Sequence, residues 1–216
     1  MDRFHTRGTC RPGALGFCLG VCAALALLSG CAVSTGQGPP RPGQPSFFNA
    51  GKALVLGVDV RTSQIAGPRE FLPVPLVLIN RRNADLTITR ESFTLVRPDG
   101  VSLPVASTEE FWTDYPQTRA DLRTSSPFFE QVFGRYPPEP FHWEELDFFP
   151  DRHSGVTPRD RWTLRAADGV FGIIYFRHPA ADQPAPAGVY QLLMRPESAD
   201  DAYVLDFVPY KTETTR

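Results

Sequence analysis

A two-residue alternation of apolar and polar side chains is the feature that most limits the folds open to this chain. It is plain in residues 52–61, where aliphatic side chains share one face while glycine and charged residues occupy much of the other: Leu54, Leu56, Val58 and Val60 against Gly57, Asp59 and Arg61. Successive side chains of a β-strand point to opposite faces, so this period predicts a strand with one buried face. Strand-like runs follow at 86–88, 161–166, 169–177, 188–195 and 202–210.

The run FLPVPLVLIN, residues 71–80, combines β-branched and leucine side chains with two prolines, Pro73 and Pro75. Proline has no backbone N–H to donate to a neighbouring strand. We therefore expect this run to lie at a sheet edge or to become a strand only after the prolines.

A Pro-Asp-Gly turn at residues 98–100 is the clearest hairpin signal in the chain. Phe93 and Leu95 precede the turn, and Val101, Leu103 and Val105 follow it. Gly100 supplies the positive φ that such turns require, so the pattern predicts two paired strands.

These signals predict a mainly β fold, a single antiparallel β-sandwich with about eight short strands. No long amphipathic helix separates consecutive strands, which disfavours a parallel sheet. Over residues 50–210 the spacing is similar to the immunoglobulin-like domains of exported bacterial proteins. The Cys-Trp-Cys signature of antibody domains is absent, and a transthyretin-like or other two-sheet arrangement fits the same pattern.

Residues 108–150 interrupt the alternation and are rich in aromatic side chains. They hold eleven aromatic residues: Phe111, Trp112, Tyr115, Phe128, Phe129, Phe133, Tyr136, Phe141, Trp143, Phe148 and Phe149. One interpretation is a partly helical insertion that caps an edge or an open end of the sandwich. The other is an exposed surface for a partner, with five candidate residues: Phe111, Trp112, Phe128, Phe129 and Trp143.

Two helices are expected inside this insertion. Ser107 or Thr108 can cap the first, with Glu110 in its first turn. The second is expected to start with Pro127 at its first position and to stop at Gly134.

The first thirty residues have the layout of an export signal. A basic start precedes an apolar stretch from Gly13 to Leu28, and small residues follow it. The apolar stretch is shorter than the roughly 20 residues that a membrane-spanning helix needs. A cleaved signal is therefore favoured over a permanent membrane span.

The exit of this signal reads Leu28-Ser29-Gly30-Cys31, which resembles the lipobox of bacterial lipoproteins. The resemblance implies that the Cys31 sulfur carries a diacylglyceryl group and that the mature chain starts at this residue. Ala32, rather than Asp, follows the cysteine, as in lipoproteins that enteric-type bacteria forward to the outer membrane.

The chain is therefore divided into a signal peptide (1–30), a flexible tether rich in proline and glycine (31–48) and a β-sandwich domain (49–211) with the insertion 108–150.

Removing residues 1–30 takes away three arginines and one aspartate, which leaves 19 basic and 23 acidic residues. This balance gives no basic surface for nucleic acid. All four cysteines lie at or before position 31, so a disulfide or cysteine metal site in the domain is excluded.

Residues 142–153 gather side chains that suit a divalent metal ion: His142, Glu144, Glu145 and His153. Their spacing matches no recognised metal motif, and a solvated acidic surface explains the same residues.

In TPRDRW, residues 157–162, Arg159 and Arg161 flank Asp160. They are suited to holding a carboxylate, although a polar turn entering a strand explains the pattern equally well.

The functional expectation is a lipid-anchored protein of the bacterial cell envelope, placed at the outer membrane, that acts as a non-enzymatic binding or structural module. Its partners would be the membrane, through the acyl chains on Cys31, and another envelope protein. No catalytic motif and no cofactor are expected. The alternatives are a metal-binding protein or metal-dependent hydrolase that uses the 142–153 cluster, and a sugar-binding protein that uses Trp112 and Trp143.

Overall fold

The computed structural model describes residues 32–33, 39–64, 70–137, 139–178 and 186–209, all within the unit Ala32–Arg216. The predicted signal peptide, Cys31 and part of the predicted tether lie outside these described residues. Within them the chain is mainly β, as the alternation predicts, with twelve strands in three sheets. No helix of this described part is both long enough and apolar enough to cross a bilayer.

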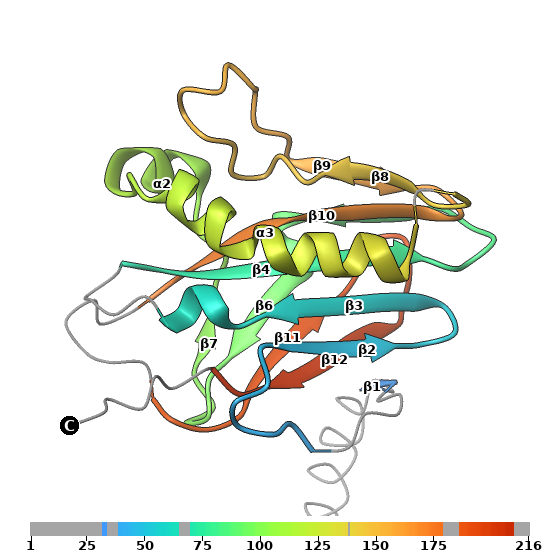
Figure 1. Cartoon of the computed structure of the whole chain (residues 1–216), viewed down its shortest axis with the longest axis horizontal. Helices are drawn as coiled ribbons and strands as arrows, with labels where there is room; N and C mark the ends of the chain where they lie inside the picture. Colours follow the sequence, from blue (N-terminus) through green and yellow to red (C-terminus); the bar gives the residue numbers. More distant parts are fainter. Residues whose placement is uncertain (1–31, 34–38, 65–69, 138, 179–185, 210–216) are drawn as a thin grey trace, which may run out of the picture. The chain divides into compact units, whose positions relative to one another are not determined.

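The strands form two five-stranded sheets and one strand pair (Figure 1). Sheet A has the order β1 (Ala32–Val33), β12 (Ala202–Phe207), β11 (Tyr190–Met194), β6 (Phe93–Val96) and β7 (Ser102–Leu103). Sheet B has the order β2 (Ser46–Ala50), β3 (Leu54–Asp59), β4 (Phe71–Asn80), β10 (Asp168–Arg177) and β8 (His142–Glu145). Sheet C pairs β5 (Leu86–Thr89) with β9 (Arg161–Leu164). All pairs are antiparallel except β1 with β12 and β8 with β10, at one edge of each large sheet.

One apolar core joins the three sheets. It includes Leu56 and Leu78 of sheet B, Leu95 and Leu205 of sheet A and Ile88 of sheet C. Each of these side chains is at most 4% exposed. Burial of this core is the main stabilising contribution to the arrangement of the sheets.

The outer face of sheet B is covered by the helix α3 (Thr118–Arg135), which runs along β4 and β10 in Figure 1. A second apolar cluster joins Val77 and Ile79 of the sheet to Phe128 and Val132 of the helix. Every residue of β3 is consequently buried, including Gly57 and Asp59. The prediction of one polar face for this strand is therefore wrong.

The prolines of β4 lie within the strand, which begins at Phe71, so the expectation that it starts after them is wrong. The pairing of β4 with β3 reaches only to Leu76, so Pro73 and Pro75 pair on one side, with β10. A missing N–H on the open side breaks no ladder bond. The expected edge is therefore found along this part of β4 alone.

The predicted hairpin is confirmed, with β6 and β7 joined by a turn in which Gly100 has a φ of +82°. The first predicted helix is also confirmed as α2 (Thr108–Asp114). Ser107 caps it by accepting a hydrogen bond from the Glu110 N–H, and the Glu110 carboxylate accepts one from the Ser107 N–H.

The second helix, α3, runs through Pro127 instead of starting there. An interior proline costs a helix about 3 kcal/mol because it removes one hydrogen bond and crowds the preceding turn. Asp121 and Ser125 before the proline, and Phe128 and Val132 after it, are all buried. Burial along the whole helix offsets the free-energy cost of the proline. Local helix propensity does not reveal this burial, so it predicted a start at Pro127.

The predicted insertion contains α2, α3 and β8, and β8 adds an edge strand to sheet B. Local pattern does not reveal β8, since three of its four residues are exposed and polar. The strand β2 is also unpredicted and begins at Ser46, within the predicted tether.

Candidate functional site: the Trp162 cavity

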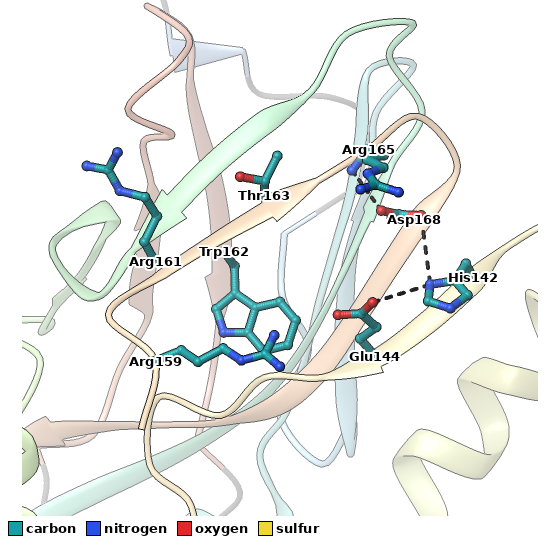
Figure 2. Close-up of a pocket in the computed structure, with 8 residues that line it drawn as sticks. All are labelled: His142, Glu144, Arg159, Arg161, Trp162, Thr163, Arg165 and Asp168. Carbon is teal, nitrogen blue, oxygen red and sulfur yellow. Dashed lines mark hydrogen bonds and ion pairs between the residues drawn. The ribbon is translucent and has the colours of Figure 1, made fainter. Parts of the chain in front are cut away.

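A cavity of about 510 Å³ opens beside β8, β9 and the start of β10 (Figure 2). We call it the Trp162 cavity. Its basic side chains are Arg159, Arg161 and Arg165. The other lining residues are Trp162, Thr163, His142, Glu144 and Asp168.

The alternation of β9 separates the residues that face solvent from those that face the core. Arg161 and Thr163 are exposed, whereas Trp162 and Leu164 are buried, with Trp162 only 5% exposed. In the antiparallel pair of β9 with β5, Trp162 lies opposite Ile88. The strand pair therefore fixes the indole within the core and leaves its polar neighbours in solvent.

Arg159 lies at the entrance to β9 and is held at both its backbone and its side chain. Its N–H donates to the Asp147 carbonyl at 2.9 Å. Its guanidinium carbon lies 4.4 Å from the centroid of the Trp162 ring, which is a cation–π contact. The pKa of the Asp147 carboxyl is raised, mainly because the group is partly buried. The Arg159 charge opposes this shift, and the Glu144 charge adds to it.

The other end of β9 is fixed by the fully buried side chain of Asn80. Its Nδ2 donates to the carbonyls of Leu164 and Arg165 at 2.9 and 3.0 Å. A tight turn follows, in which Ala167 has a φ of +63° and the Asp168 carboxylate accepts the Arg165 N–H at 2.8 Å. The cavity is thus bordered by backbone that hydrogen bonds hold in place.

Two carboxylates and a histidine lie close together on the side of the cavity near β8: Glu144, Asp168 and His142. Nδ1 of His142 is 3.6 Å from a Glu144 oxygen and 4.0 Å from an Asp168 oxygen. Parallel pairing of β8 with β10 places His142 opposite Asp168. Figure 2 shows these three side chains on one side of Trp162, with Arg161 on the other.

The three arginines differ in the hydrogen bonds and ion pairs that their guanidinium groups make with the rest of the protein. Arg161 pairs with Glu197 at 2.8 Å, and the two side chains are 65% and 43% exposed. The guanidinium groups of Arg159 and Arg165 make no hydrogen bond or ion pair within the described residues. The buried Nε1 of Trp162 also has no hydrogen-bond partner there. The lining thus carries donors that the surrounding chain does not use.

The four predicted metal candidates do not meet at one point. His142 and Glu144 line the Trp162 cavity, while His153 lines a second cavity of about 390 Å³ together with Trp112, Arg119 and Asp151. Glu145, on β8, lines neither cavity, and partial burial and the Asp147 charge raise the pKa of its carboxyl. Within the described ranges, no three histidine, cysteine or acidic side chains are grouped closely enough to hold a metal ion.

In the second cavity, Asp151 is an acceptor for its neighbours rather than an open ligand. The hydrogen bond from the His153 N–H, and then the bond and charge of Arg119, lower the pKa of Asp151. Trp112 donates its Nε1–H to the Pro150 carbonyl at 3.1 Å. These bonds join α2, α3 and the loop after β8.

The residues predicted as a possible partner surface lie mostly inside the molecule. Phe111 and Phe128 are fully buried and Phe129 is 6% exposed. Trp143 covers Gly169, where an added Cβ would lie 2.7 Å from the indole, and donates to the Tyr136 carbonyl at 3.1 Å. This placement favours the cap interpretation: Phe128, Phe129 and Trp143 belong to the cluster on the outer face of sheet B, while Phe111 belongs to the core that joins the sheets.

Sequence pattern points to part of the Trp162 cavity. Arg159 and Arg161 stand out beside Asp160, but Trp162 reads only as an apolar strand residue. Arg165 and Asp168 bracket the short turn between two strand-like runs, and this spacing is the signal that places them together in the turn between β9 and β10.

Comparisons with known proteins provide no family assignment. No family model matches the chain, and no curated protein does. A solved structure that it resembles is the yjhA protein from Bacillus subtilis, with 11% identity and a TM-score of 0.39. The match covers 76% of this chain and 96% of that one.

Proposed function

We propose that this chain is a lipid-anchored protein of the bacterial cell envelope, at the outer membrane, that acts as a non-enzymatic binding module. The Trp162 cavity is its binding site. One observation carries the proposal: the cavity holds two arginine side chains, Arg159 and Arg165, whose guanidinium groups are unpaired within the described residues. The anchor is supported by the sequence Leu28–Cys31.

A binding role is supported by the construction of the cavity on paired strands. Asn80 and the Asp168 turn hold one end of β9, and the Asp147 carbonyl holds the other. A site on fixed backbone binds with little loss of conformational entropy. Acyl chains would add a high effective concentration at the membrane, so even weak contacts become useful.

We further propose an immunoglobulin-like β-sandwich for residues 49–211. Support comes from two mainly antiparallel sheets, A and B, whose inner faces contribute to one core. The shared core of these sheets is the packing expected of such domains.

The anchor and the site are tested together by photocrosslinking in the native envelope. A photoreactive amino acid replaces Thr163, which is exposed within the cavity, and in a matched protein it replaces Ser126, which is exposed on α3. Each protein is made with Cys31 and with Cys31→Ser. We expect membrane-bound protein and a discrete adduct at position 163, and no such adduct at position 126.

In Cys31→Ser we expect loss of fatty-acid label, release from the membrane fraction and a several-fold weaker adduct at 163. Equal adducts at 163 and 126 would contradict a site at the cavity. Retention of the serine variant in membranes, with or without adducts, would contradict the lipid anchor.

A further inference from the structure

We propose that the Trp162 cavity binds an oxyanion, a phosphate or carboxylate group carried by an envelope ligand, and that Arg159 and Arg165 are its principal contacts. This inference rests on the proposed function, because it names the ligand class of the same site. It assigns the anion-binding role to the guanidinium groups that the described chain leaves unpaired.

The cavity brings positively and negatively charged side chains together. Three arginines line it against two carboxylates, Glu144 and Asp168. Nδ1 of His142 lies 3.6 Å from a Glu144 oxygen and 4.0 Å from an Asp168 oxygen. Glu197 pairs with Arg161 and the Arg159 charge acts on Asp147, so the attraction for an anion comes from the N–H donors of Arg159 and Arg165 rather than from a net positive charge.

Arg159 is the best prepared of the three arginines. A guanidinium presents planar N–H donors that match the oxygens of phosphate and carboxylate. The cation–π contact with Trp162 does not occupy its N–H donors, which make no hydrogen bond within the described residues. The stacked side chain also loses little rotational freedom when an anion binds.

Arg161 shows that this side of the cavity accepts a carboxylate. Glu197 binds it at 2.8 Å in a pair that is largely exposed. Exposed ion pairs contribute only about 0–1 kcal/mol, so an external oxyanion can replace Glu197 at little cost. Arg161 is thus a secondary contact, which the ligand oxyanion can bind in place of Glu197.

The acidic side sets the orientation of the ligand. Glu144 and Asp168 repel an anion, so the oxyanion is expected nearer Arg159 than His142 (Figure 2). A hydroxyl or amino group elsewhere on the ligand would face these carboxylates. Arg165 lines the same cavity, its backbone N–H donates to Asp168, and its guanidinium makes no hydrogen bond or ion pair within the described residues.

The test is a calorimetric titration of the full acylated chain in a non-ionic detergent. The probes are inorganic phosphate and, separately, acetate, in low-salt buffer free of other oxyanions. We expect saturable binding near one equivalent for at least one probe, and the stronger probe identifies the source of the oxyanion. Arg159→Gln and Arg165→Gln should each weaken that binding about tenfold, the loss typical of one charged hydrogen-bonding contact.

Arg123→Gln is the matched control, since Arg123 is an exposed arginine on α3 away from the cavity. It should bind as the wild type does. Arg159→Lys keeps the charge without the planar fork and should give an intermediate affinity, which separates recognition from folding. Absence of saturable binding of both probes, or equal binding by Arg159→Gln and Arg123→Gln, would overturn the proposal. Neither result bears on membrane attachment, which the Cys31→Ser fractionation tests separately.

Discussion

Gly57 shows how closely the outer face of sheet B is packed. A Cβ at this position would lie 2.5 Å from Cε1 of Phe48 and 2.9 Å from Cγ2 of Val77. The alternation predicted a polar face here, because local period does not show which distant element covers a strand. Glycine at this position is needed for close packing rather than for a turn.

We expect Gly57→Ala to lower the free energy of unfolding by about 1–3 kcal/mol, since the added methyl group overfills a packed site. Urea denaturation followed by circular dichroism measures this change. Gly134→Ala is the control: it lies on α3 with no heavy atom within 4 Å of the new Cβ. It should leave stability unchanged or raise it by up to about 1 kcal/mol, and an equal loss in both variants would count against the packing argument.

Glu145 makes stability depend on pH in a defined direction. Although Glu145 is exposed, partial desolvation of its carboxyl and the Asp147 charge raise its pKa above the ordinary value of 4.5, so the charged form is disfavoured in the folded state by an amount that solvent screening keeps small. Its contribution is therefore present at low pH and lost as pH rises through the folded pKa. Glu145→Gln should have a higher Tm than the wild type at pH 7, and the difference should close below pH 4.5. A variant less stable at pH 7 would show that the sign is wrong.

At the scale of elements, α3 is the part of the fold that its own sequence describes least well. The proline in its interior predicted a start at Pro127, whereas tertiary burial continues the helix back to Thr118. The N-terminal half also carries a fully buried acid, Asp121. Its Oδ2 accepts hydrogen bonds from Tyr115, next to α2, and from Tyr175 of β10 at 3.4 Å. Asp121 therefore links both helices to sheet B.

We expect Asp121→Ala to destabilise the fold by about 2–5 kcal/mol, because two buried tyrosine hydroxyls lose an acceptor. Asp121→Asn keeps an acceptor oxygen and should cost less than half as much. Thermal unfolding of the two variants and the wild type measures the difference. Near-wild-type stability of the alanine variant would mean that these bonds do not hold α3 to the sheet.

At the scale of the whole molecule, alternation and turn chemistry predict most strands, the β6–β7 hairpin and the cap of α2. They miss β8, whose side chains are mostly polar and exposed, and β2, which lies in a segment that composition marks as tether. The candidate site is predicted only in part for a related reason. Arg159 and Arg161 are neighbours in the sequence, but His142 and Asp168 come together only when β8 pairs with β10.

We propose that this domain is fastened to a membrane through Cys31. Mass spectrometry of the protein isolated from bacterial membranes tests it most directly. We expect the N-terminal peptide to begin at Cys31 and to carry the mass of a diacylglyceryl group, with or without an additional N-terminal acyl chain. A mature chain that begins elsewhere, or an unmodified thiol at position 31, would contradict it.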